Sequence, residues 1–148
     1  MIAAGARQKD RLVSLVTRTF GHDLRGVTLA IWGLAFKPNT NDMRQAPSLV
    51  LMQDLLAAGA TVAAYDPVAM DEARHLLPTE GVRFATSQTD ALQGADALLI
   101  VTEWKEFRSP DFELIKAKLK QAVIIDGRNL YDPKLVRSMG IEYQAIGR

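Results

Sequence analysis

Residues 27–48, VTLAIWGLAFKPNTNDMRQAPS, contain a strand, a loop and the start of a helix in direct succession. Residues 27–32 are a short apolar run with β-branched members, which is typical of a buried strand. Pro47 suits the first turn of a helix, and apolar residues recur at helical spacing after it. Because α/β folds commonly build anion sites from a strand, a loop and a helix N-terminus, Lys37 and Arg44 in this loop are candidate ligand-binding residues.

The alternation of strands and helices continues along the chain. A chain of 148 residues fits one domain of ordinary size. Alternating elements of this kind indicate a parallel sheet that is covered on both faces. The sequence therefore predicts an α/β fold with a doubly wound, mostly parallel, Rossmann-like sheet, helices on both faces, and a helix before the sheet. The expected strands are 27–32, 61–65, 82–84, 97–101, 122–125 and 142–146, and the expected helices are 6–20, 47–58, 70–77, 89–92, 111–120 and 133–139.

Composition excludes several classes of function. The chain has no cysteine, so it has neither a disulfide framework nor a thiol nucleophile. The formal net charge is only +1, which argues against a general surface for nucleic acid. The longest apolar stretches, such as residues 95–101, are far shorter than the roughly 20 residues of a membrane span. We therefore expect a soluble, cytoplasmic protein that binds neither nucleic acid nor a membrane.

Four loops are expected to meet at one edge of the sheet, because the carboxyl ends of parallel strands lie together. These loops are residues 33–46, 66–67, 102–106 and 126–128, and we call this edge the rim. Cations from the rim would suit phosphate groups, and an aromatic plane would suit a base, so the rim is a candidate site for a nucleotide diphosphate.

Two residues of the rim outside its first loop are candidate ligand-binding residues. For Arg128 a ligand role is slightly favoured over a surface ion pair. Trp104 is expected to be a packed aromatic at the edge of the pocket.

Other kinds of site find little support. Asp66 ends a strand, as the ribose-binding acidic residue of dinucleotide-binding folds does, but the sequence GLAFKP lacks the G-x-G-x-x-G fingerprint. Residues 66–67 are therefore predicted to form a turn or to cap a helix. His22 and His75 lie far apart and no cysteine accompanies them, so no metal site is predicted. No serine has a convincing histidine partner, so no catalytic residue is assigned.

Four motifs together resemble a known family: GLAFKPNTNDMRQAPS, AYDPVA, GADALLIVTEWKEFRSPDF and VIIDGRNLYDP. They are similar, in order and spacing, to the C-terminal, nucleotide-sugar-binding domain of the UDP-glucose/GDP-mannose dehydrogenase family. The resemblance covers about residues 7–148. Such enzymes oxidise a nucleotide-linked hexose twice with NAD to the uronic acid. Relatives acting on GDP-mannose and UDP-N-acetylmannosamine share the FKP-N-T loop, whereas TEWKEF followed by DGRN favours UDP-glucose 6-dehydrogenase.

The resemblance implies a role for several rim residues. Phe36 and Lys37 would contact the sugar nucleotide, and Arg128 would hold the same substrate near its ribose and phosphates. Arg44 would reach across a domain interface to NAD that is bound on another domain. Asn41 and Gln45 stand where the family commonly has an aspartate and a glutamate, and Asn41 keeps the hydrogen-bonding capacity of that position but lacks its charge.

The resemblance also implies a division of the chain. Residues 1–24 would be the end of a helix that joins two domains and carries a homodimer contact, and residues 25–148 would be the UDP-sugar-binding domain. The family's cofactor fingerprint and catalytic cysteine are missing, so we expect about the last third of an enzyme, inactive alone. The alternatives are a free-standing UDP-sugar-binding or oligomerisation module, and a fragment of a UDP-N-acetylmannosamine or GDP-mannose dehydrogenase.

Overall fold

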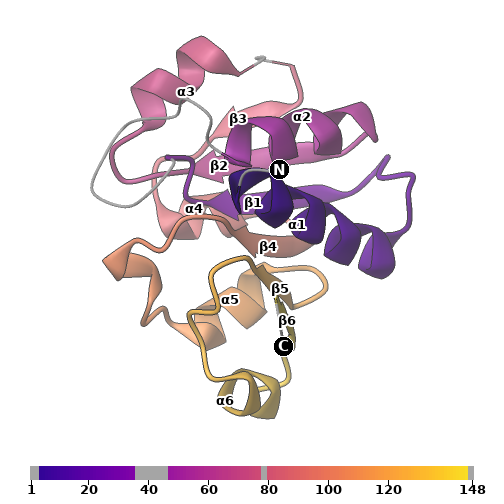
Figure 1. Cartoon of the computed structure of the whole chain (residues 1–148). Coiled ribbons are helices and arrows are strands. Elements are labelled where there is room, and N and C mark those ends of the chain that lie inside the picture. The colour runs from indigo at the N-terminus through magenta and orange to yellow at the C-terminus, as the bar shows by residue number, and fades with distance from the viewer. Residues whose placement is uncertain (1–3, 36–46, 78–79, 147–148) are drawn as a thin grey trace.

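The computed structural model describes residues 4–35, 47–77 and 80–146, and its centre is a six-stranded, wholly parallel sheet. The strand order is β3-β2-β1-β4-β5-β6 (Figure 1). The strands are β1 Thr28–Trp32, β2 Thr61–Tyr65, β3 Val82–Phe84, β4 Ala97–Ile100, β5 Val123–Asp126 and β6 Glu142–Ala145. The helices are α1 Ala4–Phe20, α2 Pro47–Ala57, α3 Met70–Leu76, α4 Gln88–Leu92, α5 Phe112–Lys118 and α6 Pro133–Ser138, with one 3-10 turn, η1 Lys105–Phe107.

Each expected element is present, with ends that differ by at most two residues, and the predicted α/β fold is confirmed. The strand expected at residues 122–125 starts one residue later because Ala122 has a left-handed backbone, with φ of 49°. The turn η1 was not predicted, since three residues of 3-10 helix leave no periodic apolar pattern.

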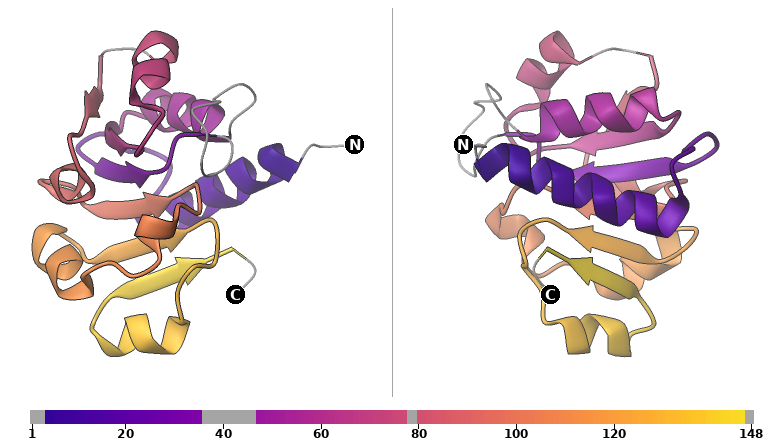
Figure 2. Two further views of the ribbon diagram at one scale, coloured as in Figure 1. Left: turned by 90° about the vertical axis from the view of Figure 1, so that its left-hand side faces the viewer. Right: turned by 45° about the vertical axis from the view of Figure 1, so that its right-hand side comes forward.

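The strands direct alternate residues to opposite faces of the sheet. In β1, Leu29 and Ile31 point to the first face, while Ala30 and Trp32 point to the second. Helices α1, α2 and α3 cover the first face, and α4, α5 and α6 cover the second (Figures 1 and 2). The sheet is therefore doubly wound, as the sequence predicts.

Helix α1 is part of the first face. Its residues Leu12 and Val16 lie one turn apart and are fully buried in the same apolar cluster as Leu99 and Ile125. The helix lies beside α2 and also contacts β5 (Figure 2). It thus completes the cover over the β4–β5 half of this face, and its predicted role in joining domains or subunits remains a prediction.

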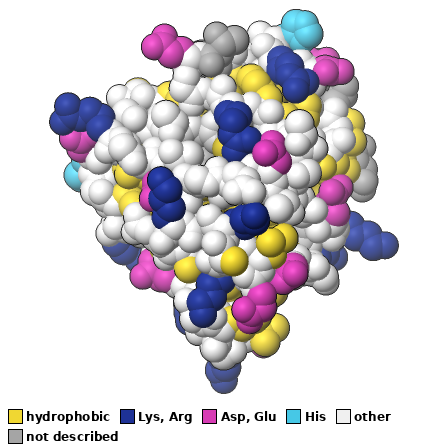
Figure 3. All heavy atoms as spheres, turned by 180° about the vertical axis from the view of Figure 1, so that it is seen from behind, with side chains coloured by type: hydrophobic (Ala, Val, Ile, Leu, Met, Phe, Trp, Pro, Cys, Tyr) yellow, Lys and Arg dark blue, Asp and Glu magenta, His cyan; other side chains and the backbone are white. Residues whose placement is uncertain are grey.

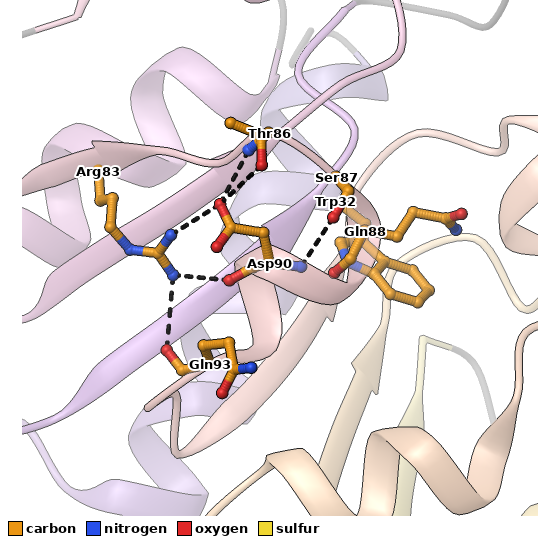
Figure 4. Close-up of polar contacts among 7 residues, drawn as sticks. All are labelled: Trp32, Arg83, Thr86, Ser87, Gln88, Asp90 and Gln93. Atoms are coloured by element: carbon orange, nitrogen blue, oxygen red, sulfur yellow. Dashed lines mark hydrogen bonds and ion pairs between the residues drawn. The ribbon is translucent and has the colours of Figure 1, made fainter.

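Short helix α4 is held to the sheet by polar contacts at both ends (Figure 4). Ser87 Oγ accepts from the backbone N–H of Asp90 at 2.9 Å and caps the helix. The Asp90 carboxylate accepts from Thr86 N at 2.9 Å and from Arg83 of β3 at 3.0 Å, and these contacts, the backbone one first, lower the pKa of Asp90. The indole N–H of Trp32 in β1 donates to Gln88 O at 3.1 Å.

The charges on the surface and the hydropathy of the helices agree with what the composition of the chain indicates. Basic and acidic side chains are interspersed on the face shown in Figure 3, without a broad patch of one sign. Within residues 4–35, 47–77 and 80–146, no helix combines the length and the apolar character that a membrane span requires.

Candidate functional site

The strand order reverses direction between β1 and β4, and the chain leaves these two neighbouring strands toward opposite faces. In doubly wound sheets, ligands bind in the crevice outside the carboxyl ends of the strands at such a point. The rim occupies this position. Its first loop is described only for residues 33–35 and its loop after β4 is described throughout.

The Asp66 carboxylate joins three parts of the rim. Its side chain is buried at the end of β2, with 1% of the residue exposed. Oδ2 accepts from Leu34 N at 2.8 Å, from Ala35 N at 3.1 Å and from the Trp104 indole at 3.1 Å. Oδ1 accepts from the backbone N–H groups of residues 68 and 69 at 2.9 and 2.8 Å, so the predicted turn at residues 66–67 is confirmed.

Three consecutive residues after β4 reach three different neighbours. Thr102 Oγ1 donates to Ala35 O at 2.7 Å, Glu103 pairs with Arg128 after β5, and Trp104 donates to Asp66 after β2. The segment 102–104 therefore ties together the loops that follow β1, β2 and β5.

The approach of this segment to the first loop depends on Gly33. Its φ of +97° lies in the left-handed region that glycine tolerates. A Cβ at this position would lie 2.5 Å from Thr102 Cβ. Glycine is therefore needed both for the turn and for the close approach.

The pair between Arg128 and Glu103 is bidentate. Arg128 Nε lies 2.9 Å from Glu103 Oε2, and Nη2 lies 2.6 Å from Oε1. Each side chain is 31% exposed, so the pair stands at the surface of the rim and is partly shielded from water. The structure thus contains an ion pair of Arg128, which was the alternative to a ligand-binding role for this residue. The ligand-binding role of Arg128 remains a prediction.

A second buried carboxylate holds the backbone near Arg128. Asp126 ends β5, and its Oδ1 accepts from Arg128 N at 2.8 Å. Its Oδ2 accepts from Leu130 N and from the Tyr143 hydroxyl, both at 2.7 Å. The position of the Arg128 backbone is therefore set from inside the domain.

A pocket of about 860 Å³ adjoins the rim, and its described lining comes from the segment 104–109, which we call the wall. The lining residues are Trp104, Lys105, Glu106, Arg108 and Ser109. Trp104 is 7% exposed, so it packs at the pocket edge as expected. The wall carries two cations, Lys105 and Arg108, and one carboxylate, Glu106. The two cations and the nearby aromatic ring are suited to an anionic ligand with a planar group.

The wall is anchored to the core. The Tyr131 hydroxyl donates to Phe107 O at 2.6 Å, and Gln88 Nε2 of α4 donates to Glu106 O at 3.1 Å. The Phe107 ring stacks on Trp32, with 5.2 Å between centroids. Burial, and secondarily the charge of Asp126, raises the pKa of Tyr131, so its hydroxyl stays protonated and able to donate to a higher pH than an exposed tyrosine would.

The structure brings Arg128 and Trp104 to one rim, linked through Glu103. Phe36, Lys37 and Arg44 lie outside the described residues, as do Asn41 and Gln45. The described residues contain no group of three or more His, Asp or Glu that could hold a metal ion.

The sequence predicted no role for Glu103 or Gln88. The sequence position of Glu103 could have indicated its pairing, because Glu103 follows β4 just as Arg128 follows the neighbouring strand β5. No sequence pattern indicated the role of Gln88, because its hydrogen bond to the wall joins segments that are 18 residues apart.

The sequence also matches a model of a protein family over residues 30–133. The model describes the UDP-binding domain of the UDP-glucose/GDP-mannose dehydrogenase family. The matched range contains all four loops of the rim.

Individual relatives agree with this match. The chain is 46% identical to a UDP-glucose 6-dehydrogenase of Pseudomonas aeruginosa and 42% identical to one of Rhizobium meliloti, in each case over 99% of this chain and 33% of the relative. A solved UDP-glucose dehydrogenase from Pyrobaculum islandicum superposes with a TM-score of 0.75 at 28% identity, over 93% of this chain and 29% of that one. The chain thus spans about a third of the length of the curated relatives it matches.

Proposed function

The chain belongs to the UDP-glucose/GDP-mannose dehydrogenase family, and from this premise we propose that it holds the UDP part of a nucleotide sugar for an NAD-dependent UDP-glucose 6-dehydrogenase. The observation that carries the proposal is the rim, where the segment 102–104 joins the loops after β1, β2 and β5 beside a pocket whose wall carries two cations and one carboxylate. The volume of about 860 Å³ falls within the roughly 300–1,000 Å³ of small-molecule sites.

Each proposed contact follows from the chemistry of the ligand. Arg128 binds the ribose and phosphate region, because a guanidinium can hold phosphate oxygens through two parallel hydrogen bonds. Trp104 contributes apolar surface at the pocket edge. Phe36 and Lys37 contact the sugar nucleotide from the first loop, as the family resemblance implies.

The described residues do not fit an NAD site. The acidic residue at the end of β2 would bind a ribose in dinucleotide-binding folds, but here both oxygens of Asp66 accept backbone or indole N–H groups. The loop after β1 also lacks the glycine fingerprint. We therefore place NAD on another domain of the proposed enzyme, with Arg44 reaching toward it.

The proposed whole reaction oxidises UDP-glucose to UDP-glucuronate and requires a thiol nucleophile as well as NAD. This chain has no cysteine, so it should be inactive by itself. Formation of NADH by the purified chain with UDP-glucose and NAD would contradict this proposal.

The binding proposal is tested by titrating the purified chain with UDP, UDP-glucose and GDP-mannose while recording amide and Trp104 indole NMR signals. We expect shifts near Trp104, Arg128, Phe36 and Lys37 with the uridine ligands. Absence of shifts at millimolar uridine ligand would overturn the proposed site, and equal shifts with GDP-mannose would overturn the preference for uridine.

Two substitutions separate the proposed roles in the first loop. Lys37→Ala should weaken the remaining UDP-glucose binding, whereas Arg44→Ala should leave it nearly unchanged because its partner is NAD. An equal loss in both variants, measured by the same titration, would contradict this division.

The proposed homodimer uses the exposed face of α1. Residues Asp10, Arg11, Ser14 and Arg18 of this face border a pocket of about 480 Å³ that also involves the end of β6. Light scattering of the purified chain tests the contact, and a monomer at high concentration would count against it. The cytoplasmic location likewise remains a prediction.

A further inference from the structure

We infer that Glu103 is a positioning residue that fixes the direction in which Arg128 presents its guanidinium to the phosphate groups of the ligand. The inference rests on the proposed function, because it requires that Arg128 bind phosphate. It assigns a specific task to a carboxylate beside a site for an anion, where a negative charge would otherwise weaken binding.

The contact geometry selects one edge of the guanidinium. Glu103 accepts from Nε and Nη2 of Arg128 at 2.9 and 2.6 Å, which is the lateral edge of the planar group. A guanidinium has a second edge, formed by Nη1 and Nη2, and this edge can also make two parallel hydrogen bonds to an oxyanion. Holding the lateral edge in place thus sets the direction of the Nη1–Nη2 edge.

Both partners lie in segments that hydrogen bonds anchor, so the pair can transmit position. Glu103 lies between Thr102, which bonds Ala35 O, and Trp104, which bonds Asp66. Arg128 is held through its backbone N–H by Asp126. The arginine side chain has many rotamers, and restricting them before the ligand arrives lowers the entropic cost of binding.

The charges of the pair favour a role for Glu103 in orienting Arg128 over a role in attracting the phosphate groups. The pair carries one positive and one negative charge, and each side chain is 31% exposed, so solvent screens part of their interaction. If Glu103 only competed with phosphate for Arg128, removal of its charge would tighten binding. If Glu103 positions Arg128, the same change weakens binding.

The experiment measures the dissociation constants of UDP and uridine for Glu103→Gln, for Arg128→Lys and for the double variant. We expect Glu103→Gln to weaken UDP binding about fivefold, in line with the worth of a charge-assisted hydrogen bond, and to leave uridine binding unchanged. In the Arg128→Lys background, where a bidentate pair is impossible, Glu103→Gln should change UDP binding less than about twofold. Glu72→Gln, on the exposed surface of α3, controls for the loss of one negative charge.

Several results would overturn the inference. Unchanged or tighter UDP binding by Glu103→Gln would show that Glu103 does not orient Arg128. An equal loss in the Arg128→Lys background, or an equal loss of uridine binding, would show an effect that does not pass through Arg128 and the phosphates.

The same experiment separates this inference from the proposed function. UDP binding by the unchanged chain is measured first, and its absence would overturn both, whereas its presence with an unaffected Glu103→Gln variant overturns the inference alone. If Glu103→Gln does not fold, Glu103→Asp keeps the charge and shortens the side chain. That variant should also lose UDP affinity, and full affinity would count against the inference.

Discussion

The two faces of the sheet are built from different side chains. Among the described residues, the fully buried members of the cluster under α1, α2 and α3 are aliphatic residues and methionine, with the partly buried Phe20 and Phe84 packed against it. The cluster under α4, α5 and α6 instead buries Trp32, Trp104, Phe107, Tyr131 and Tyr143. An aliphatic side chain contributes apolar area without direction, whereas a buried tyrosine or tryptophan also needs a hydrogen-bond partner. The first face therefore mainly stabilises the fold, and the second face also positions the rim and the wall.

The polar atoms of the second face show where this positioning acts. The Tyr131 hydroxyl bonds the wall at Phe107 O, the Tyr143 hydroxyl bonds Asp126 below Arg128, and the Trp104 indole bonds Asp66. Each of these contacts joins the buried cluster to a loop of the proposed site. Substitutions on the two faces should accordingly differ in what they change.

The largest effect is expected at Asp66, where the two faces meet. Its Oδ2 accepts from Leu34, which belongs to the first cluster, and from Trp104, which belongs to the second. Asp66→Asn would place an amide N–H₂ against buried donors and should lower the free energy of unfolding by about 3–5 kcal/mol. Urea denaturation measures this loss. Asp71→Asn is the matched control, because the Asp71 side chain is 94% exposed. Loss of its charge should lower the free energy of unfolding by less than about 0.5 kcal/mol.

The next effect is expected on the first face alone. Leu12→Ala should lower the free energy of unfolding by about 2–4 kcal/mol, because Leu12 is fully buried between α1 and the sheet. UDP binding, measured well below the unfolding transition, should remain unchanged. Leu135→Ala, where the residue is 53% exposed, is the control. A clear loss of UDP affinity in Leu12→Ala would remove the distinction between the faces.

A substitution on the second face is expected to cause a smaller loss of stability, together with weaker UDP binding. Tyr131→Phe deletes the hydroxyl that bonds Phe107 O and leaves that carbonyl without this donor. The free energy of unfolding should fall by about 1–2 kcal/mol, and UDP should bind more weakly because the wall is less firmly held. Stability is read from urea denaturation and affinity from calorimetry. Unchanged affinity would show that the wall does not depend on this contact.

The same tyrosine predicts a dependence on alkaline pH. Burial raises the pKa of Tyr131 in the folded state above the value of about 10 in the unfolded chain. Its contribution to stability is therefore complete below pH 10, and it decreases as the pH rises above 10, where the unfolded state ionises first. The advantage of the unchanged chain over Tyr131→Phe should shrink by about 1 kcal/mol between pH 9 and pH 11. A constant advantage over this range would contradict the assignment.

The smallest effect is expected at Gln88, which joins α4 to the wall. Gln88→Ala removes the 3.1 Å bond from Nε2 to Glu106 O at an exposed position. It should lower the free energy of unfolding by less than about 1 kcal/mol and weaken UDP binding about twofold. Gln93→Ala is a suitable comparison, because only the backbone oxygen of Gln93 contacts Arg83. A larger effect in Gln93→Ala than in Gln88→Ala would count against the role of Gln88.

Most of the fold could be predicted from periodicity. The run 27–32 and the helix starting at Pro47 carry local patterns that are independent of the rest of the chain, and the alternation of such patterns implies a parallel sheet. The meeting of the loops followed from that topology, and contacts such as Thr102 with Ala35 bear it out. The turn of Asp66 was also predictable, because an aspartate before a proline has a strong local preference.

By itself the sequence determined the strands and α-helices, the parallel arrangement of the strands, the edge at which a site would form and the family to which the motifs belong. These features depend on local propensity and on patterns that recur within about ten residues. Only the tertiary structure decided that Asp66 serves the loops and not a ribose, that Glu103 pairs with Arg128, and that α1 completes the first face. Those outcomes depend on contacts between residues 25 to more than 80 positions apart, and hydrogen bonds over such separations are selected by the packing of the whole domain.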